Sequence, residues 1–197
     1  MRVLLAITGA SGSIYGLRLL EELLRAAHSV TLVTSESGID VCRYETGIDT
    51  GNPESLKQLS GLPDADLTIR DVNDIWAPEA SGSAAPDAMV IAPCSMGTIG
   101  RIAAGISGNL IERAADVMLK ERRPLLLLPR ETPFSTIHLE NMLRLSQCGA
   151  RIIPAMPGFY HRPESLDDIV CFVVGKLLDQ MGVNHTLFNR WEGKHNG

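Results

Sequence analysis

The chain has 197 residues, of which 45% are hydrophobic, and a formal net charge of −5. This length fits one well-filled domain, and the acidic balance argues against a nucleic-acid partner, because phosphate backbones need an extended basic surface. The apolar runs are only a few residues long, and no charged leader with an apolar signal core precedes the first strand. We therefore expect a cytoplasmic enzyme without a membrane span.

The first third of the chain alternates strand and helix. Val3–Ile7 is an apolar run that a Gly-rich turn follows, and leucines then recur at helical spacing as far as Leu24. Val30–Val33 predicts a second strand, with a helix after it toward Thr46. Residues 47–66 are rich in Gly, Pro, Asn and Asp, so we expect no long element there and predict a mobile insertion or lid.

Later apolar runs predict further strands, and two stretches of helical spacing lie among them. The strands are Leu67–Arg70, Ala88–Ala92, Leu125–Leu128 and Arg151–Ile153, the helices are Ser135–Gln147 and Leu166–Leu178, and a tail begins at about residue 182. Residues 76–83 indicate a loop. The alternation predicts a single-domain, Rossmann-like α/β fold with three αβα layers, in which helices cover both faces of a parallel sheet.

The four cysteines lie far apart in the sequence, and they form no Cys-x-x-Cys pair and have no histidine at metal-ligand spacing. We therefore predict reduced, mostly buried thiols at Cys42, Cys94, Cys148 and Cys171, and no metal site. Cys94 alone lies in a candidate site loop, where a catalytic thiol is the alternative.

Cations gather before a lone carboxylate in the second half of the chain. Residues 113–130 contain five Lys or Arg and two acids. Arg113 and Lys120 project from one face of a predicted helix whose opposite face is apolar, so they face water, a ligand or another subunit. Pro124 ends this helix, and a strand of four leucines leads to Arg130 and Glu131. These two residues suit phosphate binding and proton transfer, with a surface ion pair as the alternative.

Three polar turns follow three of the predicted strands: Gly9–Gly12, Thr34–Ser35 and Ser95–Thr98. Each places backbone N–H groups and small hydroxyls at a helix start, which suits a phosphate-bearing cofactor, although ordinary helix capping would account for any one turn. The first turn lacks both the G-x-G-x-x-G fingerprint and the Gly-Lys-Ser/Thr ending of a nucleotide loop. Nicotinamide cofactors and ATP are therefore disfavoured.

Seven motifs occur in order: Thr8-Gly9-Ala10-Ser11-Gly12, Pro78-x-x-Ser81-Gly82-Ser83, Pro93-Cys94-Ser95, Glu112-Arg113-Ala114-Ala115-Asp116, Lys120-Glu121-Arg122-Arg123-Pro124, Pro129-Arg130-Glu131 and Gly158-Phe159-Tyr160-His161. With them the chain resembles the UbiX family of flavin prenyltransferases from about residue 2 to residue 191. The resemblance implies the fold of flavin-containing cysteine decarboxylases and transfer of a dimethylallyl group from dimethylallyl monophosphate to reduced FMN. It also implies a dodecamer built from trimers and a functional link to a UbiD-type decarboxylase.

Carried over by residue, the resemblance implies FMN contacts from Gly9, Ala10, Ser11, Ser35, Ser95, Met96, Gly97, Thr98 and Arg130. It implies a prenyl-phosphate site made of Ser81, Arg113, Lys120, Arg130 and Tyr160, with Glu45 and Trp76 nearby. For catalysis we predict Glu131 as the acid and Ser11 as a proton relay, with Glu45 and Trp76 as further participants. Helix capping is the alternative role for Ser11, and loop packing is the alternative for Trp76. Lys176 stands where a family member has arginine. A lysine still neutralises phosphate as a point charge, but it lacks the bidentate fork of arginine.

Two other functions compete with this reading. A flavin-dependent cysteine decarboxylase would use a histidine in the early half of the chain, as the resemblance suggests, but no histidine occurs between His28 and His138. A non-catalytic FMN carrier would have no use for cations beyond those that hold the FMN phosphate. The pair Arg113 and Lys120 therefore favours the transferase.

Overall fold

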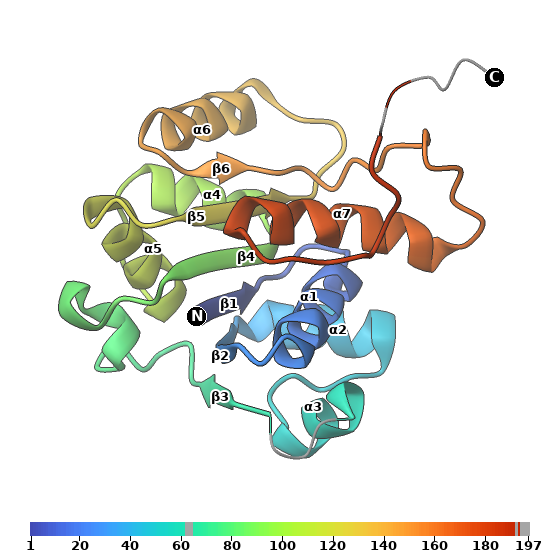
Figure 1. Cartoon of the computed structure of the whole chain (residues 1–197). Helices are drawn as coiled ribbons and strands as arrows, with labels where there is room; N and C mark the ends of the chain where they lie inside the picture. Colours follow the sequence, from blue (N-terminus) through green and yellow to red (C-terminus); the bar gives the residue numbers. More distant parts are fainter. Residues whose placement is uncertain (62–64, 192, 194–197) are drawn as a thin grey trace.

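The computed structural model describes residues 1–61, 65–191 and 193, and it shows one sheet with helices on both faces (Figure 1). The strands are β1 (Arg2–Ile7), β2 (Ser29–Thr34), β3 (Leu67–Arg70), β4 (Ala88–Cys94), β5 (Leu125–Pro129) and β6 (Arg151–Ile152). Neighbouring strands pair in parallel, in the order β3-β2-β1-β4-β5-β6. The predicted parallel sheet is confirmed.

The helices are α1 (Ser13–Arg25), α2 (Glu36–Thr46), α3 (Pro53–Ser60), α4 (Met96–Ala103), α5 (Leu110–Lys120), α6 (Thr136–Gln147) and α7 (Leu166–Met181). Two short 3-10 turns, η1 (Pro78–Ala80) and η2 (Gly82–Ala84), lie in or beside the predicted loop. One face of the sheet packs against α4, α5 and α6, and the other face packs against α1 and α7. The sheet is therefore the middle one of three layers, as predicted.

The strands are apolar on both faces because helices cover both faces. In β1, Leu4 enters one hydrophobic cluster, whereas Val3 and Leu5 enter the other. In β4, all seven residues are buried. Such strands need uninterrupted apolar sequence, so the polar residues that could do chemistry are left to the loops at the two edges of the sheet.

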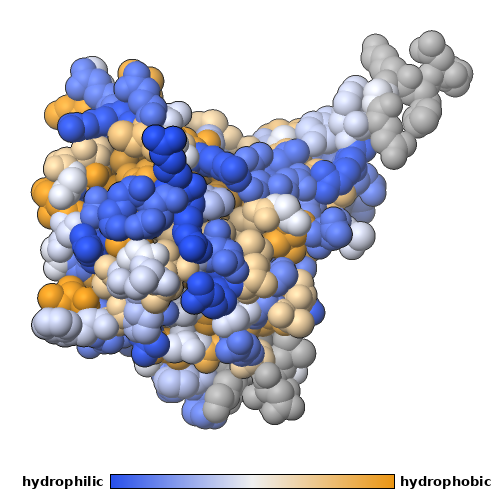
Figure 2. Space-filling view, turned by 60° about the vertical axis from the view of Figure 1, so that its left-hand side comes forward, coloured by the Kyte–Doolittle hydropathy of each residue, from blue (hydrophilic) through white to orange (hydrophobic). Residues whose placement is uncertain are grey.

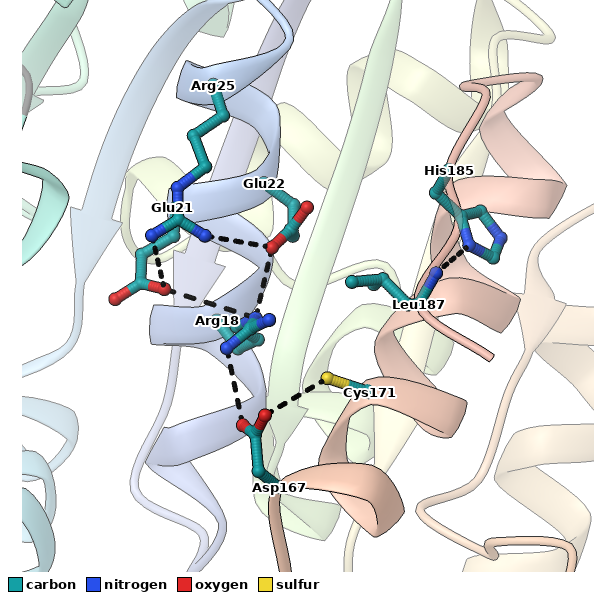
Figure 3. A network of polar contacts seen from close by, with 8 residues as sticks. All are labelled: Arg18, Glu21, Glu22, Arg25, Asp167, Cys171, His185 and Leu187. Carbon is teal, nitrogen blue, oxygen red and sulfur yellow. Dashed lines mark hydrogen bonds and ion pairs between the residues drawn. The ribbon is translucent and has the colours of Figure 1, made fainter. Parts of the chain in front are cut away.

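Helices α1 and α7 lie side by side, and charged side chains join them (Figure 3). The Arg18 guanidinium lies 3.3 Å from the carboxylate of Asp167 at the start of α7, and 3.1 Å from Glu22 in its own helix. The Cys171 thiol donates to Asp167 at 3.6 Å. Burial raises the pKa of Cys171 to about 11, so this thiol stays protonated at neutral pH.

A short helix, α3, lies within residues 47–66, where the composition predicted no long element. Pro53 takes the first helical position, which its fixed φ favours, and the Asn52 side chain accepts a hydrogen bond from Glu54 N at 3.0 Å. Leu56 is fully buried in the cluster on the α1 side of the sheet. The Asn-Pro start signal is hidden by the surrounding loop-like composition. Residues 62–64 of the predicted insertion lie outside the described residues.

The chain after α7 runs back along that helix. Gly182 ends α7 in the left-handed conformation, with φ 74°. A β-carbon on Gly175 would lie 2.7 Å from His185 Cε1, so only glycine allows this close packing. Residues 192 and 194–197 of the predicted tail lie outside the described residues. Among the helices that the structure describes, none has the length and apolar character needed to cross a membrane.

Candidate functional site

The direction in which the chain winds across the sheet reverses between β1 and β4. The chain continues from β1 to β2 and β3 on one side, whereas β4, β5 and β6 lie on the other. Ligands of open α/β sheets bind outside the carboxyl ends of the strands at such a switch point. The turns after β1, β2, β4 and β5 bring nine predicted residues to this edge: Gly9, Ala10, Ser11, Ser35, Ser95, Met96, Gly97, Thr98 and Arg130. We call these nine residues the edge cluster.

Two serines of the edge cluster cap helices. Ser35 is the N-cap of α2 and accepts a hydrogen bond from Gly38 N at 3.1 Å. Ser95 is the N-cap of α4 and accepts one from Thr98 N at 3.3 Å. Capping, the alternative for these turns, therefore occurs. It also fixes both hydroxyls at the sheet edge, and each hydroxyl oxygen still carries a hydrogen that it can donate.

Arg130 joins the turn after β5 to the turn after β1. Its Nε donates to the backbone oxygen of Ser11 at 3.0 Å. The neighbouring Glu131 does not pair with it in the described part of the chain, and Glu131 Oε1 instead accepts from Thr132 N at 3.1 Å. The alternative of an Arg130–Glu131 ion pair is therefore not formed, and a guanidinium and a carboxyl stand separately at one edge.

Glu45 reaches from α2 to the N-terminus of α1. Its Oε2 accepts from Gly12 N at 3.0 Å and from Ser13 N at 2.9 Å, where the helix has no cap of its own. Burial raises the pKa of Glu45, but hydrogen bonds from the Ser11 hydroxyl and the backbone N–H groups of Ser13 and Gly12 outweigh it, so the pKa lies below its ordinary value. Glu45 is therefore an anion at neutral pH and lies beside Ser11.

The geometry of the four cysteines does not support a catalytic or metal-binding role for them. All four are unpaired, and Cys42, Cys94 and Cys171 are buried, whereas Cys148 is exposed. Cys94 is fully buried, and burial raises the pKa of its thiol, which disfavours the alternative of a catalytic thiolate there. Within residues 1–61, 65–191 and 193, no group of acidic, histidine or cysteine side chains is arranged to hold a metal ion.

Ser81, Arg113 and Lys120 form a second group, which we call the α5 cluster. Arg113 Nε donates to the carbonyl of Ala80 at 3.1 Å, which holds the loop that carries Ser81 against α5. Lys120 pairs with its neighbour Glu121. Arg113 is partly exposed and Lys120 exposed, whereas the opposite face of α5 is buried, so the predicted orientation of this helix is correct.

The Lys120 end of the α5 cluster lies toward the amino edge of the sheet, away from the edge cluster. Arg123, just after α5, donates to the carbonyls of Ala85 and Pro86, and Arg2 at the start of β1 donates to Ala85 at 2.9 Å. Figure 2 brings this side forward, and hydrophilic side chains cover much of it. No hydrogen bond or ion pair within the described residues joins the α5 cluster to the edge cluster.

Tyr160 and Lys176 form a third group around the Phe172 ring, which we call the α7 cluster. The Tyr160 ring meets Phe172 edge to face at 5.7 Å, and Lys176 Nζ lies 5.5 Å from the Phe172 centroid and 5.0 Å from that of Phe188. Trp76 belongs to none of the three clusters, and 91% of its surface is exposed. A large aromatic side chain this exposed in one chain suits contact with a ligand or a second subunit.

The residues that hold Lys176 in place are not among the predicted site residues. Asp179 lies 3.9 Å from Lys176 and also receives hydrogen bonds from Arg190 at 2.6 Å and from His185 at 3.1 Å. Phe188 covers the lysine from the tail. The three-residue spacing of Lys176 and Asp179 on one helix is the signal that could have indicated this pairing.

Comparisons with known proteins agree with this architecture. The family model described as Flavoprotein matches residues 1–178. A relative named flavin prenyltransferase UbiX, from Alkalihalophilus pseudofirmus, is 54% identical over 94% of this chain and 93% of its own length. A solved structure of AnUbiX (PadA1) in complex with FMN and dimethylallyl pyrophosphate has a TM-score of 0.90 and 40% identity, with 98% of each chain covered.

A second solved structure is a dodecameric FMN-dependent UbiX-like decarboxylase from Escherichia coli O157:H7. It has a TM-score of 0.89 and 42% identity, and the match covers 98% of this chain and 100% of that one. The relatives are matched over nearly their whole length, and the shared identity is far above the level at which only a fold is shared. The chain therefore belongs to the UbiX family of flavin prenyltransferases, within the flavoproteins.

Proposed function

We propose that this protein joins a dimethylallyl group from dimethylallyl monophosphate to reduced FMN. The product is the prenylated FMN that a UbiD-type decarboxylase would use, and we place the reaction in the cytoplasm. The observation that carries this proposal is the edge cluster: in a chain of this family, hydroxyls, a guanidinium and Glu131 meet at the switch point of the sheet. The clusters around α5 and α7 add the cations that a phosphate leaving group needs.

The donor set of the edge cluster fits FMN. A phosphate monoester needs N–H and hydroxyl donors and a cation, and the cluster offers the capped starts of α2 and α4 together with Arg130. The start of α1 is already filled by Glu45, which disfavours a second phosphate there. When bound, reduced FMN supplies the nucleophilic ring atoms to which the prenyl group is joined.

Cations make the phosphate a better leaving group. The allylic C–O bond breaks as negative charge grows on the phosphate, and Arg113, Lys120, Arg130 and Lys176 would stabilise that charge in a site that excludes water. These side chains can do so without a divalent metal. Lys176 is oriented by Asp179 and two aromatic rings, so it can act as a fixed point charge where a family relative has arginine.

Two carboxyl groups and a hydroxyl handle protons in this proposal. Glu131 protonates the departing phosphate, since it lies beside Arg130 and is free of an ion pair with it. Ser11 relays a proton near the flavin, and the anionic Glu45 beside it accepts the Ser11 hydrogen bond. Trp76 presents its ring to the developing allyl cation, an attraction of roughly 2 kcal/mol when desolvated.

We also propose that the active unit is a homo-oligomer, with a dodecamer as its form. The α5 cluster faces outward from one chain and Trp76 is 91% exposed, and among the described residues neither makes a hydrogen bond or ion pair with the edge cluster. Helix α6 leaves Ile137 exposed by 66%, Leu139 by 53% and Leu143 by 59%, and exposed apolar side chains of this size suit a subunit contact. A neighbouring subunit could then bring its α5 cluster to the edge cluster of the first.

Anaerobic incubation with reduced FMN and dimethylallyl monophosphate tests the function. We expect release of phosphate and a flavin whose mass has increased by one C5H8 unit, as read by mass spectrometry. Dimethylallyl pyrophosphate in a parallel reaction shows which donor is preferred. An unmodified flavin with both donors would refute the proposal, and decarboxylation of a cysteine-containing peptide would favour the cysteine decarboxylase instead. Bound FMN with neither activity would favour a flavin carrier.

A further inference from the structure

Thr8 is buried at the point where β1 and β4 end, and its side chain is fully used in hydrogen bonds. Only 1% of its surface is exposed. The Thr8 hydroxyl donates to the carbonyl of Pro93 at 3.0 Å and accepts from Ser95 N at 2.8 Å. The Thr8 backbone N–H also donates to Pro93 at 3.2 Å. The Thr8 side chain therefore bonds to Pro93 near the end of β4 and to Ser95, the first residue after that strand.

This hydroxyl connects two turns of the edge cluster. The strand register of β1 with β4 ends at Ala6 and Ile91, and beyond it one backbone bond, from Thr8 N to Pro93 O, still joins the two segments. The next residue after Thr8 is Gly9 of the edge cluster, and Ser95 is the N-cap of α4 and bonds to Thr98. The Thr8 hydroxyl adds the bond to Ser95 N, so it helps to set the position of one turn relative to the other, although it is too deeply buried to touch a ligand itself.

We propose that Thr8 is a positioning residue for the flavin, which holds the turn after β1 and the turn after β4 in their binding arrangement before FMN arrives. The inference rests on the proposed binding of FMN by the edge cluster. Without the hydroxyl, the Ser95 N–H has no partner inside the protein, so the turn moves to solvate it. Only the fraction of molecules that keep the original arrangement then binds FMN with full affinity.

Four variants distinguish the effect of the Thr8 hydroxyl on FMN binding from the effect of its methyl group and from the effect of replacing any buried threonine. Thr8→Val keeps the shape and removes the hydroxyl, Thr8→Ala removes both groups, and Thr8→Ser keeps only the hydroxyl. Thr50→Val is the matched control, because Thr50 is also 1% exposed and its hydroxyl has no hydrogen-bond partner among the residues that the structure describes. Affinity for oxidised FMN is measured by quenching of flavin fluorescence, and hydrogen exchange at the Ser95 amide is measured in ligand-free protein.

We expect Thr8→Val and Thr8→Ala to raise the Kd for FMN about tenfold or more and to speed exchange at Ser95, while Thr8→Ser and Thr50→Val stay near wild type. If Thr8→Val does not fold, Thr8→Ala and Thr8→Ser decide the question. The inference is overturned if FMN affinity and Ser95 exchange do not change without the hydroxyl, or if Thr8→Ser is as impaired as Thr8→Ala. A wild-type protein that binds no FMN would instead overturn the proposed function.

Discussion

Glu45 and Glu131 both lie near the edge of the sheet at which the strands end, but their surroundings differ. The difference suits them to different roles. Glu45 accepts hydrogen bonds from two backbone N–H groups at the start of α1, and they hold it as an anion. Glu131 follows Arg130 at the end of β5 and accepts one hydrogen bond from its neighbour Thr132. The first side chain is fixed and charged, and the second is the freer one, which suits a group that must give up a proton to a substrate.

Glu131→Gln should bind both ligands and fail in an early chemical step. Glutamine keeps the shape of the side chain but has no acidic proton for the leaving phosphate, so we expect the single-turnover rate to fall by about 10² to 10⁴-fold. The rate is measured anaerobically by rapid quenching, with FMN and donor affinities measured alongside. Glu140→Gln, an exposed carboxyl on α6, serves as the control. A normal single-turnover rate in Glu131→Gln would show that this residue is not the acid.

Glu45→Gln should change how stability depends on pH. A carboxyl whose folded pKa is lowered stabilises the folded protein above its unfolded pKa of about 4.3, and this contribution is lost as the pH falls through the lowered folded value. The wild type should therefore be more stable than Glu45→Gln at pH 6, and the difference should shrink below about pH 4. Urea unfolding across this range measures it. An equal difference at every pH would contradict the prediction.

At the scale of elements, the sequence was most informative where burial leaves little choice. The leucines of β5 and the apolar run of β1 must be buried on both faces, so their position and parallel pairing follow from pattern alone. Helix α3 could not be predicted from the pattern, because eight residues make too few turns for a clear periodicity. Its start signal also lies in a segment whose composition is typical of loops. The hydroxyl caps at Ser35 and Ser95 were predictable, since small polar residues after a strand favour helix starts.

The sequence yields a candidate set of site residues, but it does not show how all of them meet in space. Spacing along α5 correctly indicated that Arg113 and Lys120 face away from the core. The predicted parallel sheet also implies that α5 ends toward the amino edge, because the helix leads directly into the start of β5. Thr8 and Asp179 were missed because each acts through partners that the fold supplies: Thr8 through Pro93 and Ser95, and Asp179 through the tail.

At the scale of the whole molecule, the separation of the clusters predicts that one active site uses residues of different chains. We expect Arg113→Ala and Glu131→Gln proteins to be inactive alone and to regain activity when their subunits are mixed. If each site takes Arg113 from one chain and Glu131 from another, random mixing in equal amounts leaves about a quarter of the sites intact. Activity is measured as prenylated flavin formed, after native mass spectrometry has confirmed that subunits exchanged.

A matched mixture distinguishes sharing between chains from simple stabilisation by mixing. Arg113 and Lys120 lie on the same helix, so a site that takes both from one chain stays incomplete when Arg113→Ala is mixed with Lys120→Ala. That mixture should remain inactive while the first regains activity. Mixed oligomers of the first pair that stay wholly inactive, or a stable monomer with full activity, would show that each chain builds its own site. The cations of α5 would then have to reach the edge cluster by a rearrangement within one chain.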